Sequence, residues 1–409
     1  MGTPTELVGI DEIRSAREGL RGVLRPTPVE PSTNISAICG RTVSFKPEFR
    51  QRTGSFKIRG AHHHIASLPD DGVAVVAASA GNHAQGVALA SALLGRPSVV
   101  FMPTGTPLPK VEATRAYGAD VRLTGETVDD AITAAGRYAE ETGGHLVPPF
   151  DDRLVIAGQG TLGLELAEEM GVADTVVVPV GGGGLISGVA VALAAERPGV
   201  RVIGVEADGA ASMVASLAAG EPVTLGEVRT IADGIALKCP SALTLAHVTT
   251  FVDEVVTVTD EEIGRALILL LERAKAVVEP AGAVGLAALL AGKVPGSSPA
   301  VAVLSGGNVD PLMLIRLVEH GLSAAGRYLR LRVIVPDRPG ALAWVTQTIA
   351  EIGINVLAVE HHRAGVQVGI GEVEVLFTLE TRDDRHREQV VAALRDAGYT
   401  ADPVGQDVP

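Results

Sequence analysis

The chain has 409 residues and a mass of 42.0 kDa, a length that favours two or three domains. Hydrophobic residues make up 46% of it, enough apolar material for large cores, so global disorder is excluded. The formal net charge of −14 disfavours general binding to nucleic acid or to an anionic membrane, because phosphate binding depends on Lys and Arg.

The cysteine content and the N-terminus indicate where the protein works. Two cysteines, Cys39 and Cys239, are too few for a disulfide framework or a four-thiolate zinc site, and they fit a reducing compartment. The first 25 residues lack the apolar core and cleavage site of a signal peptide, and no apolar stretch is long enough to span a membrane. We expect a cytoplasmic protein with neither a membrane nor a nucleic-acid partner.

Short apolar runs alternate with helical segments over the first three quarters of the chain. The expected elements are strand 73–78, helix 84–94, strand 98–102, helix 108–117, strand 120–123, helix 128–141 with Thr127 as its N-cap, helix 154–170, strand 175–180, helix 185–195, strand 201–205, helices 261–275 and 281–290, and strand 300–304. This alternation predicts an α/β fold whose sheets are mainly parallel.

The rhythm changes after about residue 326. The expected elements are then strand 328–335, helix 341–352, strands 354–361 and 373–380, helix 387–397 and a short strand 399–403. The order βαββαβ is that of a ferredoxin-like domain. We place the border near Ala324-Ala325-Gly326, which gives domains of residues 1–326 and 327–409.

Lys57 stands between Phe56 and Ile58, where a helix is expected to begin. A lysine is ordinarily a solvated surface charge. A buried lysine has a lowered pKa and can act as an amine nucleophile or a base. Its own sequence context leaves both interpretations open.

Three further motifs follow predicted strands. Gly181 to Gly184, with Leu185 after them, connect a strand to a helix and favour an anion site, because glycines let backbone N–H groups surround the anion; a tight turn is the alternative. Ser79-Ala80-Gly81-Asn82-His83 ends the first strand of the alternating region, at the sheet edge where α/β proteins bind ligands; Asn82 as a helix cap is the alternative. Ser305 follows the strand 300–304, and an ordinary loop is the alternative there.

Taken together and in this order, the four motifs resemble the fold-type II pyridoxal-phosphate enzymes, and among them the threonine dehydratases, also called threonine ammonia-lyases. The resemblance extends from Arg25 to Asn308. It implies two open α/β subdomains with parallel-rich sheets, the smaller of about residues 50–148 inserted in the larger.

The resemblance also implies the roles of particular residues. Lys57 would hold pyridoxal 5'-phosphate as a Schiff base and act as the catalytic base. The other cofactor-binding residues would be Phe56, Asn82, Gly181, Gly182, Gly183, Gly184, Leu185, Gly234, Glu279 and Ser305. The substrate carboxylate would be held by Ser79, Ala80, Gly81, Asn82 and His83.

The implied reaction is that of a carbon–nitrogen lyase, which converts L-threonine to 2-oxobutanoate and ammonia and also L-serine to pyruvate. A neutral Ser305 beside the ring nitrogen favours elimination over transamination. The related serine racemases carry a serine as acid/base where this chain has Ala80, which disfavours racemisation. An L-serine dehydratase or a serine racemase-like enzyme remains an alternative, and an inactive amino-acid sensor is an alternative of another class.

The metal, regulatory and histidine motifs carry less information. Glu206, Ala210 and Ser212 match the cation site of the racemases, but Ser212 replaces an acid, so whether a cation binds remains open.

The C-terminal unit resembles an ACT domain whose ligand loop holds Asp337, Pro339 and Gly340. This resemblance implies isoleucine or valine as an effector and a homodimer or homotetramer. A dimerisation module without a ligand is the alternative. We interpret His62-His63-His64 as a helix surface rather than a metal site.

Overall fold

The computed structural model describes residues 6–324, 326–362 and 369–404. The chain divides into two compact units, Met1–Asp310 and Pro311–Pro409. The border expected near Ala324-Ala325-Gly326 stays a proposal, because Ala325 lies outside the described residues. Within the described ranges, no helix has both the length and the apolar composition needed to cross a membrane.

The first unit contains a larger sheet of six strands in the order β1-β2-β10-β7-β8-β9. The strands are β1 (Glu30–Pro31), β2 (Val43–Lys46), β7 (Thr175–Pro179), β8 (Arg201–Ala207), β9 (Glu254–Val258) and β10 (Ala300–Val303). All neighbouring pairs are parallel except β1 and β2. Parallel strands place their carboxyl ends at one edge of the sheet, which is where ligands bind in such folds.

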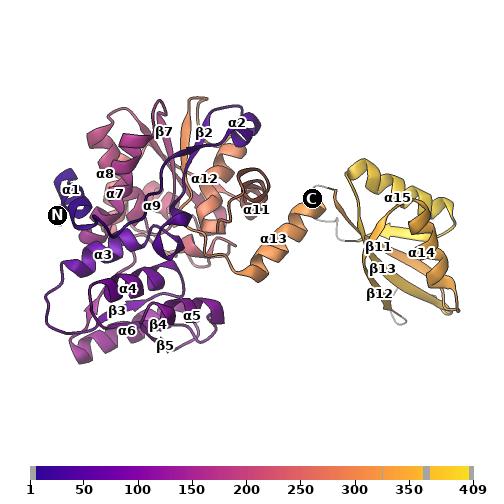
Figure 1. Cartoon of the computed structure of the whole chain (residues 1–409), viewed down its shortest axis with the longest axis horizontal. Helices are drawn as coiled ribbons and strands as arrows, with labels where there is room; N and C mark the ends of the chain where they lie inside the picture. The colour runs from indigo at the N-terminus through magenta and orange to yellow at the C-terminus, as the bar shows by residue number, and fades with distance from the viewer. Residues whose placement is uncertain (1–5, 325, 363–368, 405–409) are drawn as a thin grey trace. The chain divides into compact units, whose positions relative to one another are not determined.

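Helices cover both faces of the larger sheet (Figure 1). They are α1 (Ile10–Gly19), α2 (Thr33–Cys39), α7 (Arg153–Glu169), α8 (Gly184–Glu196), α9 (Ser212–Ala219), α10 (Ala242–Phe251), α11 (Asp260–Leu269) and α12 (Pro280–Leu290). Val176 and Val178 of β7 pack in one core cluster with α7 and α8, whereas Val177 between them faces α12 at Gly285. The alternation along β7 therefore supplies the apolar contacts on both sides of the sheet.

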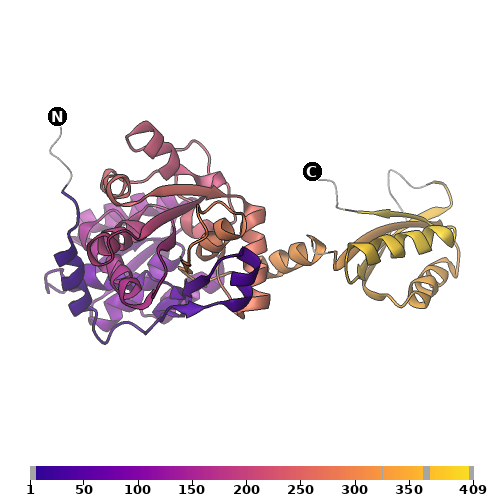
Figure 2. The same ribbon diagram turned by 90° about the horizontal axis from the view of Figure 1, so that it is seen from above.

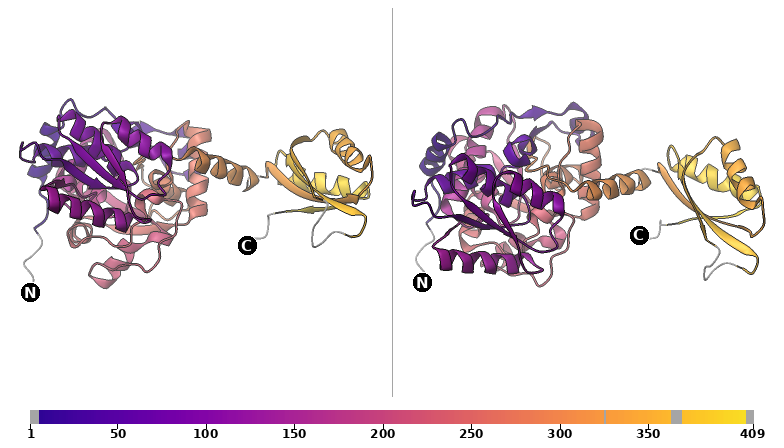
Figure 3. Two further views of the ribbon diagram at one scale, coloured as in Figure 1. Left: turned by 90° about the horizontal axis from the view of Figure 1, so that it is seen from below. Right: turned by 60° about the horizontal axis from the view of Figure 1, so that its bottom comes forward.

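A smaller, fully parallel sheet has the order β5-β4-β3-β6. Its elements are α3 (Ile58–Ala66), β3 (Val75–Ala78), α4 (Asn82–Leu93), β4 (Ser98–Met102), α5 (Leu108–Ala116), β5 (Asp120–Leu123), α6 (Val128–Thr142) and β6 (His145–Leu146). One face packs on α3, α4 and α5, and the other packs on α6. Figure 3 shows this sheet and its helices in indigo and purple.

The second unit begins with α13 (Pro311–Ala324) and then forms an antiparallel sheet in the order β12-β13-β11-β14. Its other elements are β11 (Tyr328–Pro336), α14 (Ala341–Glu351), β12 (Asn355–His362), β13 (Glu372–Glu380), α15 (Asp384–Asp396) and β14 (Thr400–Pro403). Alternate residues of β11 and β13 pack against both helices, drawn in orange and yellow in Figure 2. The expected ferredoxin-like order is confirmed.

Most of the expected elements are confirmed to within a few residues, including the capping of α6 by Thr127. The helix expected over 261–275 differs, because α11 ends at Leu269 and continues as a single π-type turn up to Lys275, whose φ is +55°. Strands β1, β2, β6 and β9 were not expected, since all four are short and carry charged or polar residues. Helices α1, α2, α9, α10 and α13 were not expected either.

Candidate active site

A cavity of about 740 Å³ in the first unit gathers the ends of β3, β7 and β10 with the start of α3. It is lined by every residue for which the sequence predicts a cofactor or substrate contact: Phe56, Lys57, Ser79, Ala80, Gly81, Asn82, His83, Gly181, Gly182, Gly183, Gly184, Leu185, Gly234, Glu279 and Ser305. Residues more than 200 positions apart in the chain thus share one site.

Lys57 is the N-cap residue of α3, and its side chain reaches into this cavity. Its Nζ donates a hydrogen bond to the carbonyl oxygen of Pro149 at 2.9 Å and lies 5.2 Å from the centroid of the Phe56 ring. Burial lowers the pKa of the Lys57 amine to about 8, against an opposing effect of the Glu279 carboxylate. A lowered pKa leaves more of the amine neutral near pH 7, as a nucleophile or base requires.

The glycine loop, Gly181 to Gly184, leads from β7 into α8 and admits no side chain. A Cβ at Gly182 would overlap the ring of Phe150, and one at Gly183 would lie 2.8 Å from Met213 Cε. Gly183 also has φ +88°, a conformation that favours glycine. The first N–H groups of α8 have no intrahelical partner, so the loop can hold a phosphate. The site therefore fits pyridoxal phosphate.

Asn82 links the two sheets at the cavity wall. Its Nδ2 donates to Glu279 Oε1 at 2.6 Å, and its Oδ1 accepts from Asn308 Nδ2 at 2.7 Å. It is the first residue of α4, whose N-cap is Gly81, so the interpretation of Asn82 as the cap is wrong. Burial, and next the charge of Asp233, raise the pKa of Glu279 to about 7.

The loop before α4 offers backbone donors to the cavity. Gly81 N donates to Ser79 Oγ at 3.1 Å, which orders the loop, and the first N–H groups of α4 are without intrahelical acceptors. The His83 side chain is buried, and its Nε2 donates to the carbonyl oxygen of Val147 at 2.9 Å. Burial, reinforced by the nearby Lys57 charge, lowers the pKa of His83 to about 3, so its ring stays neutral.

Several cavity residues were not predicted from the sequence. Phe150 packs on the glycine loop, and two ion pairs line the cavity: Lys110 Nζ with Asp233 Oδ2 at 2.7 Å, and Lys238 Nζ with Asp129 Oδ2 at 3.1 Å. Both pairs join helices of the smaller sheet to a loop about 110 to 120 residues away, and no local pattern predicts such a contact.

The candidate cation residues lie at the end of β8 and the start of α9, outside the cavity lining. Glu206 is fully buried, and its two carboxylate oxygens accept from Met213 N at 2.8 Å and Val214 N at 2.9 Å. Burial raises the pKa of this carboxyl to about 7. Among the described residues, no cluster of three or more His, Cys, Asp or Glu side chains could hold a metal ion. Glu206 thus serves as a cap of α9.

Two other sequence motifs can be placed. The expectation that His62-His63-His64 forms a helix surface is wrong for His62 and His64, which are buried because α3 lies between the smaller sheet and α7. His64 Nδ1 lies 2.9 Å from Asp152 Oδ1. In the second unit, the segment from Asp337 to Gly340 connects β11 to α14, as expected, and Gly340 has φ +92°.

Comparisons with known proteins agree with this geometry. Residues 20–306 match the family described as pyridoxal-phosphate dependent enzyme, and residues 329–398 match the ACT domain. L-threonine ammonia-lyase of Geobacter sulfurreducens is 49% identical over 95% of this chain and 98% of its own. The protein of the same name from Thermotoga maritima is 46% identical over 98% of this chain and 100% of its own.

Among solved structures, maize serine racemase has a TM-score of 0.73 and 39% identity, covering 78% of this chain and 99% of its own. The family match includes the cavity residues from Phe56 to Ser305, and the residues present there fit the cofactor. The chain therefore belongs to the pyridoxal-phosphate dependent enzyme family and carries a C-terminal ACT domain.

Proposed function

We propose that the protein is an L-threonine ammonia-lyase, which converts L-threonine to 2-oxobutanoate and ammonia and accepts L-serine as a second substrate. The observation that carries this proposal is the cavity, which brings Lys57, the glycine loop and Ser305 together. The two full-length relatives named L-threonine ammonia-lyase support the choice of substrate.

Each side of the cavity has its own task. The glycine loop would hold the cofactor phosphate, Ser305 the ring nitrogen, and the backbone N–H groups of Ser79 to His83 the substrate carboxylate. When bound, pyridoxal phosphate supplies an electron sink for the substrate Cα. The Lys57 amine removes the Cα proton as general base. Loss of the β-hydroxyl as water leaves an enamine, and its hydrolysis gives the 2-oxoacid and ammonia.

Ala80 separates this reaction from racemisation. Racemisation needs a proton donor on the face of Cα opposite Lys57, and the methyl group of Ala80, which lines the cavity, cannot donate one. We therefore propose that the chain eliminates water from L-serine but releases no D-serine, although maize serine racemase shares its fold.

The test is 2-oxoacid release by the purified holoenzyme from L-threonine and L-serine, with chiral analysis of the remaining amino acid. We expect release from both, no D-isomer, and a loss of at least about 10³-fold in Lys57→Ala. A normally loaded enzyme that releases no 2-oxoacid from either substrate would contradict the proposal.

We further propose that the ACT domain binds isoleucine or valine through the segment Asp337 to Gly340, and that the protein is a homodimer or homotetramer. The support is the placement of this segment between β11 and α14 and the domain match itself. Isoleucine should change the threonine saturation curve of the full chain but not that of a variant ending at Asp310, where the first unit ends. Equal responses of the two proteins to isoleucine would exclude a role for the C-terminal unit in binding this effector. Analytical ultracentrifugation measures the number of subunits.

A further inference from the structure

Helix α3, which begins directly after Lys57, is shared between the two sheets of the first unit. Ile58, Ala61 and Ile65 belong to the core on one face of the smaller sheet. The other side of α3 lies against α7, which packs on the larger sheet: a Cβ at Gly60 would lie 2.5 Å from Gln159 Nε2 and 2.7 Å from the carbonyl oxygen of Val155. The position of Lys57 therefore depends on whether α3 is held more firmly by the smaller sheet or by α7 and the larger sheet.

The backbone before Lys57 is fixed to the larger sheet. Gly307 N donates to Gly54 O at 2.9 Å, and Phe56 N donates to Ser305 O at 3.1 Å, in the segment after β10. The glycine loop and Ser305 belong to the same sheet. In contrast, the substrate loop from Ser79 to His83 follows β3 of the smaller sheet.

Arg59 provides a second attachment, two residues after Lys57. Its guanidinium is fully buried, and all five of its N–H groups are satisfied. Nε and Nη2 donate to Glu48 at 2.9 and 2.8 Å, Nη1 and Nη2 donate to Glu165 at 2.7 and 2.9 Å, and Nη1 donates to Thr161 Oγ1 at 3.1 Å. Such a two-sided fork fixes both the position and the rotation of the side chain.

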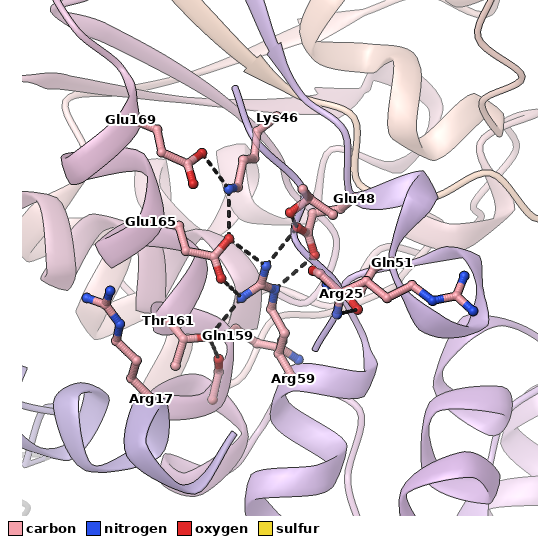
Figure 4. Close-up of polar contacts among 12 residues, drawn as sticks. Arg17, Arg25, Lys46, Glu48, Gln51, Arg59, Gln159, Thr161, Glu165 and Glu169 are labelled. Atoms are coloured by element: carbon pink, nitrogen blue, oxygen red, sulfur yellow. Dashed lines mark hydrogen bonds and ion pairs between the residues drawn. The ribbon is translucent and has the colours of Figure 1, made fainter. Parts of the chain in front are cut away.

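The partners of Arg59 all belong to the larger sheet, its covering helices or the segment that follows β2. Thr161 and Glu165 lie on α7, and Glu48 lies in the short helix Glu48–Arg50, which directly follows β2. Lys46 of β2 continues the network, with Nζ 2.7 Å from Glu165 Oε2 and 3.0 Å from Glu169 Oε2. Figure 4 shows Arg59 between Glu48 and Glu165, with Lys46 beyond them.

We propose that Arg59 is a positioning residue for Lys57. Its buried fork holds the first turn of α3 on α7, so that Lys57 stays in register with the glycine loop and Ser305 while the smaller sheet brings the substrate loop to the cavity. Without this attachment α3 would be held less firmly on α7, and its apolar contacts with the smaller sheet would draw the Lys57 amine away from the glycine loop and Ser305. This inference rests on the proposed function of Lys57.

The test compares two substitutions of buried cations in the same network. Arg59→Lys keeps the charge but leaves one nitrogen in place of the fork. Lys46→Met removes a cation that touches Glu165 and Glu169 but neither Arg59 nor α3, and it serves as the matched control. Both variants should lower Tm, because each disturbs a buried ionic network. Thr161→Val, which removes one acceptor of Arg59, is the milder second variant.

The first readout is turnover by the holoenzyme. We expect Arg59→Lys to lower kcat for threonine by about tenfold or more with KM changed by less than about threefold, because a shift of the base by about 1 Å is costly. Lys46→Met should keep kcat within about twofold at a similar or larger loss of Tm, because the hydrogen-bond acceptors of Arg59 all remain in place. Thr161→Val should change kcat in the same direction as Arg59→Lys, by a smaller factor.

The second readout does not need the cofactor. In cofactor-free protein, the rate at which an acylating reagent labels Lys57 is measured by peptide mass spectrometry. Arg59→Lys should change this rate by about threefold or more, and Lys46→Met should not. If kcat and labelling change equally in both variants, or in neither, Arg59 is merely structural. If the wild type releases no 2-oxoacid, the proposed function fails, whereas the labelling experiment still decides whether Arg59 positions Lys57.

Discussion

The ring of Phe150 packs against the backbone of Gly182, so that the glycine loop has no room for even one methyl group on that side. Gly182→Ala should push the ring or the loop aside and weaken cofactor binding by about tenfold or more, because the N–H groups would no longer converge on one phosphate. Titration of the cofactor-free variant with pyridoxal phosphate measures this.

The control for this prediction is Gly136→Ala. Gly136 lies inside α6, and a Cβ there meets nothing within 4 Å. Alanine should stabilise this helix by about 0.5–1 kcal/mol and leave cofactor binding unchanged. Equal cofactor affinity in Gly182→Ala and wild type would show that the loop does not hold the phosphate.

Glu279 gives a pH dependence of stability with a definite sign. Its pKa is raised to about 7 in the folded protein, from an ordinary value of 4.5, so folding favours the protonated form. The stability that it contributes is fully present below about pH 4.5 and is lost as the pH rises through about 7. Glu279→Gln keeps an acceptor for Asn82 but does not titrate.

Urea unfolding of the cofactor-free proteins over this pH range tests the point. Between pH 4.5 and 7, the free energy of unfolding of Glu279→Gln should rise by about 3 kcal/mol relative to that of wild type. Above about pH 7, the difference between the two proteins should stay constant. A difference that does not vary with pH would mean that the pKa of Glu279 is not raised.

Phe377 tests whether the C-terminal unit is stabilised independently. It is 1% exposed and packs in a core whose members all come from residues 329–401. Phe377→Ala should cost the C-terminal unit about 3–5 kcal/mol. Trp344→Ala is the matched control, because Trp344 is 55% exposed and its loss should cost less than about 1 kcal/mol.

Calorimetry and threonine turnover without effector give the readouts. The transition of the C-terminal unit should move to lower temperature in Phe377→Ala, and turnover should stay within about twofold of wild type, because the cavity lies wholly in the first unit. Loss of turnover in step with the melting of this unit would contradict its independence.

The sequence predicts the elements whose signal is local. Strand Ser98–Met102 has four consecutive apolar residues after Ser98, and α6 has its cap at Thr127, so both are found where expected. Strand β2 was missed, since a lysine in a four-residue strand argues against burial. Lys46 is nevertheless buried, because Glu165 and Glu169 neutralise it from more than 100 residues away.

The same limit applies to the site. Motif residues at strand ends could be assigned because a resemblance gave them roles, and the structure places them around one cavity. The residues that depend on packing could not be assigned. Nothing near Phe150 or Lys110 in the sequence indicates the glycine loop or Asp233, and the burial of His62 follows only from the position of α3 between two bodies.

Arg59 also bears on the order in which a newly made chain acquires its shape. Its acceptors Thr161 and Glu165 come 102 and 106 residues later in the chain. Until α7 emerges from the ribosome, burial of α3 against the smaller sheet would leave three of the five N–H groups of Arg59 without an acceptor, at a cost of several kcal/mol. The strands of the smaller sheet all precede α7 in the chain, yet they cannot bury α3 stably before α7 has been made. A nascent chain arrested before residue 153 should therefore still be cut by protease within α3.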